Sequence, residues 1–244
     1  MVYHFNDLLK LAENCGPVWF NEIFKQLFDD IDIKEYLIKL IEKYNMKKTI
    51  YPPFENIFNQ FKQCSLNDIS VIIFGYKPTN KPNLTNIINE LYDEYKYVIT
   101  DRNFKTNFRN DYKNKIKEWN NQGVLTLYYC LTYDSTDPKF HVDLWRLFMN
   151  RVIKLIQLKQ KYIIFLLWEN GLGEVPTILR EDIKDDSKRT KSKNDKDKRK
   201  EEITYYVLQR DAIQIRNNKF MGCNHFIIAN HYLKEWFKPE IKWV

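Results

Sequence analysis

The chain of 244 residues has few cysteines and no long apolar run. Its four cysteines, Cys15, Cys64, Cys130 and Cys223, are scattered without a CxxC pair, which argues against a zinc site and against a disulfide framework. No run of about 18 apolar residues could span a bilayer, and residues 1–10 lack the basic and apolar regions of a secretory signal. We therefore expect no metal, cofactor or membrane segment, and a reducing intracellular compartment, the nucleus or a cytoplasmic replication site.

Positive charge and aromatic side chains are abundant instead. The formal net charge is +7 and the isoelectric point is about 9.0, so an anionic partner, nucleic acid first, is expected. A solvated basic surface without any partner is the alternative. Hydrophobic residues make up 44% of the chain, and aromatic residues 16%, which is enough to bury the core of a single domain over residues 1–244.

One segment interrupts this pattern. Residues 181–202 contain nine basic and eight acidic side chains and one apolar residue, Ile183. Such a segment cannot bury enough surface to fold, so it is predicted to be a disordered loop insertion. Because its charges nearly cancel, the basic surface belongs to the rest of the chain.

Short apolar runs alternate with helical patterns along the sequence. Strands buried on both faces, or nearly so, are expected at residues 71–75, 123–131, 162–168 and 205–208. Helices with apolar residues at i, i+3 and i+4 are expected at residues 20–28, 32–44, 84–95, 143–158 and 225–236. Asp32 is a candidate cap for the second of these helices. The alternation predicts an α/β protein, a three-layer α/β/α sandwich around a mainly parallel four-stranded sheet.

The loop after the first strand is the natural place for chemistry in such a fold. Gly75 and Pro78 end the apolar run, and a helical pattern opens at Asn83. The loop, residues 75–80, reads Gly-Tyr-Lys-Pro-Thr-Asn.

Many stretches, taken in chain order, resemble the uracil-DNA glycosylases of family 1. They are Ile50–Pro53 with Phe58 and Asn59, Val71–Gly75 with Pro78, Asn83–Leu84, Glu90–Leu91, Trp119 with Gln122–Leu125, Leu131–Thr132, His141 with Trp145, Phe165–Trp168, and a C-terminal stretch from Phe220 to Trp243. The resemblance implies the fold of that family. It also implies an enzyme that flips uracil out of DNA and hydrolyses its bond to deoxyribose.

The residues that carry this chemistry are replaced, however. By the resemblance, a carboxylate in the first loop should orient water and offset the positive charge that develops on the sugar, and Lys77 occupies its position. Two like charges a few ångströms apart cost about 4 kcal/mol at an effective dielectric near 20, or about a thousandfold in rate. Thr79 replaces the tyrosine that excludes thymine, and Tyr128 replaces the asparagine that reads uracil. Residues 209–214, with Arg210, hold no histidine where the catalytic one should lie.

We therefore expect a catalytically inactive protein of glycosylase fold that binds DNA, a replication or repair partner, or both. Poxvirus relatives of the family that also serve the replicative polymerase indicate the second kind of partner. Tyr76 and Tyr128 are expected to fill the former uracil pocket. Phosphate contacts are expected from Lys77, Asn80, Lys81, Asn83 and Arg210.

Two alternatives stay open. One is an active but altered glycosylase, with a carboxylate brought from elsewhere, for which Asp68 and Asp211 are the candidates. The other is an interaction scaffold without DNA contact. His141 and His225 are interpreted as packing or hydrogen-bonding residues, not as catalysts.

Overall fold

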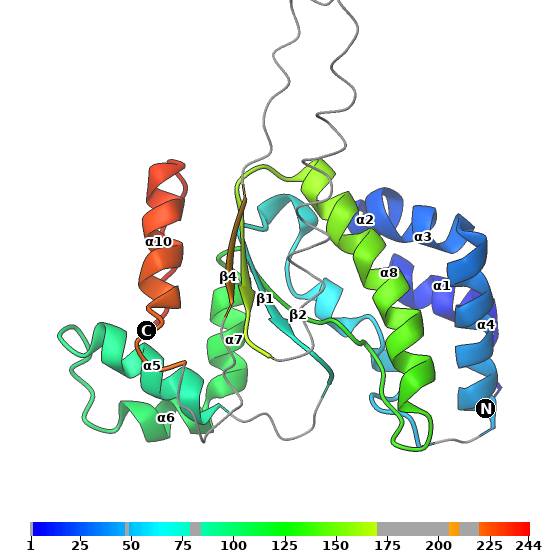
Figure 1. Ribbon diagram of the computed structural model, residues 1–244, viewed down its shortest axis with the longest axis horizontal. Helices are drawn as coiled ribbons and strands as arrows, with labels where there is room; N and C mark the ends of the chain where they lie inside the picture. The colour runs from blue at the N-terminus through cyan, green and yellow to red at the C-terminus, as the bar shows by residue number, and fades with distance from the viewer. Residues whose placement is uncertain (1, 47–48, 79–83, 170–204, 210–219) are drawn as a thin grey trace, which may run out of the picture.

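A four-stranded sheet separates two layers of helices in the computed structural model (Figure 1). The structure describes residues 2–46, 49–78, 84–169, 205–209 and 220–244. Within these residues the strands are β1 (Val71–Gly75), β2 (Val124–Tyr128), β3 (Ile163–Leu167) and β4 (Tyr205–Gln209). They lie in the order β2-β1-β3-β4, and each neighbouring pair is parallel. The predicted three-layer sandwich around a parallel four-stranded sheet is confirmed.

Strand β1 lies in the middle of the sheet because its side chains are apolar on both faces. Val71 to Phe74 are buried, as the continuous apolar run predicts for a parallel strand between two helical layers. The register pairs Gly75 with Tyr128 and Phe74 with Leu167. The last residues of three strands therefore meet, and we call this region the carboxyl end of the sheet.

The first helical layer is formed mostly by the N-terminal part of the chain (Figure 1). It comprises α1 (Phe5–Glu13), α2 (Pro17–Trp19), η1 (Phe20–Phe24), α3 (Lys25–Asp29), α4 (Ile31–Asn45) and α8 (Pro138–Lys159). Three single turns, η2 (Phe54–Asn56), η3 (Asn59–Lys62) and η4 (Leu66–Asp68), lead into β1. Aromatic rings fill the space between this layer and the sheet. Phe58 stacks on Phe148 of α8, with ring centroids 6.1 Å apart, which holds α8 against the turns.

The second layer lies on the other face. It comprises α5 (Thr85–Tyr95), α6 (Phe104–Asn110), α7 (Tyr112–Asn120) and α10 (His225–Glu235). Trp119 of α7 packs edge-on against Trp243 at a centroid distance of 5.1 Å, and its indole N–H donates to the Trp243 carbonyl. The C-terminal residues thereby join α7 to α10, because Phe226 of α10 contacts both tryptophans.

Several element boundaries differ from the sequence prediction. Helix α8 begins at Pro138, not at 143, because Asp137 accepts from the amide of Phe140 and caps the helix one turn earlier. Helix α4 is capped by Asp30 instead of Asp32, since the Asp30 carboxylate accepts from the amides of Asp32 and Ile33. Strand β2 ends at Tyr128 rather than at Leu131. Helices α6 and α7 had no prediction, because their segment is mostly polar.

Two further predictions concern segments and membranes. Residues 181–202, predicted to be a loop insertion, lie outside the described residues. Among the helices that the structure describes, none is both long and apolar enough to cross a membrane.

Candidate functional site

A cavity of about 800 Å³ opens at the carboxyl end of the sheet. One wall is the end of the sheet itself, another is α7, and a third is the turn η3. The lining combines apolar and aromatic side chains with amides, lysines and one carboxylate. The residues are Gln60, Lys62, Gln63, Ile73, Phe74, Gly75, Leu84, Ile87, Tyr112, Lys113, Ile116, Lys117, Asn120, Asn121, Thr126, Leu127, Tyr128, Trp168 and Glu169.

The carboxylate belongs to Glu169, which sequence reasoning did not select. It follows β3 by two residues, and its Oε2 accepts a hydrogen bond of 2.7 Å from the main-chain amide of Tyr76. Its Oε1 lies 3.2 Å from the point that a Cβ on Gly75 would occupy. Residues at the ends of neighbouring parallel strands share one region of space, so the acidic residue directly after the buried run 162–168 was the signal that could have indicated it.

The ring of Tyr128 lies against Gly75. Its Cδ1 and Cε1 atoms are both 2.8 Å from the position of a Cβ built on Gly75, so only glycine fits beside the ring. Burial first, and then the negative charge of Glu169, raise the pKa of Tyr128 to about 12. The phenol is therefore neutral near pH 7 and retains its proton as a hydrogen-bond donor.

The two tyrosines predicted to fill the former pocket lie in different surroundings. Tyr128 forms part of the wall of the cavity. Tyr76 packs against the core cluster of the first helical layer, and it is not among the residues that line the cavity. The cavity beside Tyr128 has a volume of about 800 Å³. That Tyr128 fills the former uracil pocket stays a prediction.

Lys77, in the loop after β1, is exposed. Its Nζ atom lies 4.0 Å from the ring centroid of Tyr133, a cation–π contact. The loop backbone is fixed by hydrogen bonds of 2.8 Å from Tyr129 N to Gly75 O and from Cys130 N to Tyr76 O. Lys77 is not among the residues that line the cavity.

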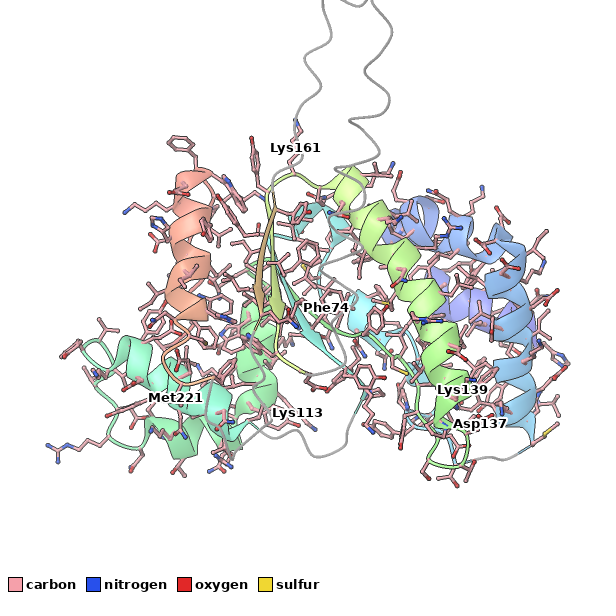
Figure 2. The ribbon with its side chains drawn as sticks, viewed as in Figure 1. Phe74, Lys113, Asp137, Lys139, Lys161 and Met221 are labelled. Atoms are coloured by element: carbon pink, nitrogen blue, oxygen red, sulfur yellow. The ribbon has the colours of Figure 1, made fainter. Side chains whose placement is uncertain are left out.

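The other predicted DNA contacts, Asn80, Lys81, Asn83 and Arg210, lie outside the described residues, as does Asp211. The structure instead brings three lysines to the cavity that sequence reasoning missed: Lys62 from η3, and Lys113 and Lys117 from α7. The two on α7 are one helical turn apart, which places them on one face. Figure 2 shows Lys113 near the carboxyl end of the sheet and Lys161 at the opposite end.

Asp68, one candidate for a substitute carboxylate, lies at the wrong end of the sheet. Its carbonyl carbon and oxygen pack against Gly123, directly before β2 begins. The chemistry of a parallel sheet is placed beyond the other end of the strands, so Asp68 is not part of this site.

His141 and His225, which are interpreted from the sequence as packing or hydrogen-bonding residues, both form hydrogen bonds inside the protein. His141 is fully buried, with its Nδ1 atom 2.7 Å from the Thr132 hydroxyl, and burial lowers its pKa to about 4. His225 accepts from the indole N–H of Trp168 at 3.0 Å. Neither is among the residues that line the cavity.

Two carboxylates and a thiol cluster between α5 and α10. Ligand atoms of Glu90, Glu94 and Cys223 lie within 4.8 Å of one another. Glu90 accepts from the amides of Gly222 and Asn224, at 2.6 and 2.8 Å. Glu94 accepts from the first amides of α10. Both side chains therefore fix the loop and cap the start of α10 through these hydrogen bonds, which accounts for the cluster without a ligand.

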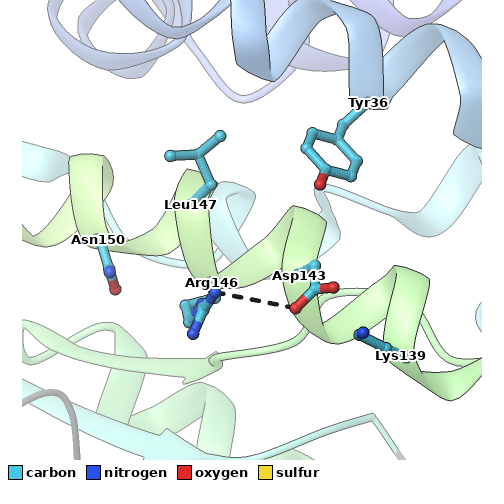
Figure 3. Close-up of a pocket in the computed structure, with 6 residues that line it drawn as sticks. All are labelled: Tyr36, Lys139, Asp143, Arg146, Leu147 and Asn150. Carbon is cyan, nitrogen blue, oxygen red and sulfur yellow. Dashed lines mark ion pairs between the residues drawn. The ribbon is translucent and has the colours of Figure 1, made fainter.

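A second hollow, of about 690 Å³, lies between α4 and α8 (Figure 3). It is lined by Tyr36, Lys139, Asp143, Arg146, Leu147 and Asn150. Asp143 and Arg146 form an ion pair of 3.9 Å across one turn of α8. The hollow belongs to the first helical layer and contains no residue from the carboxyl end of the sheet.

A three-layer sandwich with a cavity at the carboxyl end of its parallel sheet is the architecture of the uracil-DNA glycosylases. The crystal structure of mimivirus uracil-DNA glycosylase matches 99% of this chain and 94% of its own, with a TM-score of 0.68 and 17% identity. UNG from Nitratifractor salsuginis matches 97% and 96%, with a TM-score of 0.54 and 14% identity. These likenesses establish the fold.

The sequence is also similar to those of curated uracil-DNA glycosylases. The chain is 26% identical to the uracil-DNA glycosylase of Fusobacterium nucleatum over 247 aligned residues, which cover 91% of this chain and 95% of the relative. It is 27% identical to that of Buchnera aphidicola, over 85% and 90% of the two chains. No protein-family model matches the chain. The chain is thus similar to uracil-DNA glycosylases over most of its length and has their fold.

Proposed function

We propose that this chain is a DNA-binding protein that uses the uracil-DNA glycosylase fold without the usual hydrolytic chemistry of that fold, and that it serves DNA repair or replication. One observation carries the proposal. The loop that leaves β1 presents a cation, Lys77, whose ammonium lies over the ring of Tyr133, where the resemblance implies a carboxylate.

The cavity itself supports DNA binding. Lys62, Lys113 and Lys117 surround it and are exposed, and their ammonium groups suit phosphate oxygens. The charge balance of +7 agrees with an anionic partner. Lysines that contact the backbone bind without reading sequence, so the expected affinity is general and depends strongly on salt.

Salt titration of DNA binding tests the proposal. Fluorescence anisotropy with a labelled uracil-free duplex, from about 50 to 200 mM salt, should give a linear fall of log affinity with log salt. The double variant Lys113→Ala/Lys117→Ala should make that slope less negative by about two, one per lost phosphate contact. The matched control Lys25→Ala/Lys39→Ala removes the same charge from the first helical layer and should leave the slope unchanged. A flat salt response in the wild type refutes DNA binding and favours an interaction scaffold.

A second candidate, an altered glycosylase, is favoured by Glu169. Its carboxylate lies at the end of β3, directly beside the loop that carries Lys77, and could take over the electrostatic role that the loop has lost. Release of uracil from labelled single-stranded DNA separates the two candidates. A rate well above background that disappears in Glu169→Gln and persists in Lys77→Ala would establish this second candidate and refute the first.

A further inference from the structure

We propose that a single row of cations on α6 and α7 binds the backbone of an unpaired DNA strand that extends from the cavity. The inference rests on the proposed DNA-binding function and deepens it. It names the form of DNA and the path of the strand beyond the cavity.

The row consists of Lys105 and Arg109 on α6 and of Lys113 and Lys117 on α7, which follow one another at intervals of four residues. Residues 96–117, which include the row, hold seven basic and two acidic side chains, a net charge of +5 in a chain whose total is +7. Most of the excess positive charge of the protein therefore lies in this one segment.

No carboxylate neutralises the row. All four side chains are exposed, and none of them forms an ion pair with any residue that the structure describes. Lys115, on the same helix but outside the row, is paired with Glu118. Like charges four residues apart on a helix repel each other, so the row lowers the stability of α6 and α7 in the free protein. An anion that lies along the row removes this cost.

Two contacts show where the row leads. Arg109 donates from Nη2 to the Thr85 hydroxyl at 3.3 Å, at the first residue of α5 and next to Leu84, which lines the cavity. The Nζ atom of Lys105 lies 4.5 Å from the ring centroid of Tyr92, about 10 Å further along α5. Helix α6 packs against both α5 and α7, as Figure 1 shows. The row thus begins at the α7 lysines in the cavity wall and continues outward along α5.

Aromatic rings alternate with these cations. Tyr112 lies between Arg109 and Lys113 in the sequence and forms part of the cavity wall, and Tyr92 lies beneath Lys105. Both tyrosines are half-buried, so each still presents part of its surface. Proteins that bind single strands combine a basic groove with rings on which unpaired bases stack. In a duplex the bases are paired and stacked on one another, so the alternation favours an unpaired strand.

Fluorescence anisotropy with strands of different length tests the inference. The probes are labelled strands of about 4, 8 and 16 nucleotides without self-complementarity, which span the range of known single-strand sites, and a hairpin duplex of about 16 base pairs. At equal salt the longest strand should bind the wild-type protein about tenfold or more tighter than the duplex, as expected when at least one base stacks on a ring.

Two double variants locate the effect. For the longest strand, Lys105→Gln/Arg109→Gln should make the slope of log affinity against log salt less negative by about 1.4, or about 0.7 for each lost phosphate contact. The shortest strand, bound by the cavity lysines alone, should keep its slope. The matched control Lys34→Gln/Lys39→Gln removes two exposed lysines of α4 that also lie over aromatic rings, and it should change neither slope. The comparison of strand with duplex uses the wild-type protein, so misfolding of a variant does not decide the test.

Three outcomes are distinct. Tighter binding of the long strand than of the duplex, together with a slope change confined to the α6 variant and the longer strands, supports the inference. Duplex binding as tight as that of the strand, or an α6 variant that behaves like its control, overturns it and leaves the proposed DNA-binding function intact. Absence of binding to every probe overturns both.

Discussion

The close approach of Tyr128 to Gly75 can be tested by adding a single methyl group. In Gly75→Ala the new Cβ would lie 2.8 Å from two ring carbons of Tyr128, whereas carbon atoms pack best at about 3.5–4.0 Å. The ring, which forms part of the cavity wall, must therefore move by roughly 1 Å. Overpacking of this kind costs about 1–3 kcal/mol of the free energy of unfolding.

A double-mutant cycle assigns that cost to one contact. In the background of Tyr128→Ala the methyl group no longer meets the ring and keeps only the contact with Glu169 Oε1 at 3.2 Å, so most of the penalty of Gly75→Ala should disappear. The coupling between the two positions should then be about 1–3 kcal/mol. Tyr128→Phe is the matched control. It keeps the ring carbons and should retain the full penalty.

Urea unfolding, followed by fluorescence with equal slopes for all variants, gives the required free energies. If the two changes add within about 0.3–0.5 kcal/mol, the ring does not lie over Gly75. The description of the cavity wall would then be wrong.

The remaining predictions concern stability. Glu90→Ala should lower the free energy of unfolding by about 1–3 kcal/mol, because it leaves two partly buried amides without their acceptor, whereas Glu90→Gln, which keeps one acceptor oxygen, should cost less in the same urea titration. Burial raises the pKa of Glu94 to about 8, above its unfolded value. Its contribution is therefore complete below about pH 4.5 and lost as the pH rises toward 8, a loss that Glu94→Gln should remove from thermal melts recorded across this range. The pKa of His141 is lowered to about 4, so the opposite sign applies. Stability should fall by about 2–3 kcal/mol as the pH drops from 6.5 toward 4, and a melt series that is flat over that interval would contradict this.

The fold could be predicted because its signals are local. Four buried apolar runs alternate with helical stripes, and each run became a strand of the parallel sheet within a few residues of its expected bounds. The failures also have local causes. Helix α8 begins one turn early because Asp137 can cap it, and a cap is visible in sequence only when the helix start is already known. Helices α6 and α7 bury few residues, so their apolar period is weak.

The site was harder to predict because it is made of residues far apart in the chain. Lys77 could be placed on the first loop from the sequence alone, but the direction of its side chain depends on Tyr133, more than fifty residues later. The lysines of α7 contribute through tertiary contacts that no local pattern indicates, and the only local signal for Glu169 was its place directly after a buried run. A sequence shows which residues end each strand, and only the register of the strands shows which of those ends meet.

The parallel register at the carboxyl end has a broader consequence for how such a molecule changes over time. The strands β1, β2 and β3 all place their last side chains at the carboxyl end of the sheet. The buried apolar residues that precede them in each strand stabilise the fold. Exchanging a terminal residue, such as Lys77 or Glu169, leaves those buried runs untouched. A protein of this fold can therefore lose one activity through substitutions at one strand end, and gain another through substitutions at a neighbouring strand end, while the fold itself is kept.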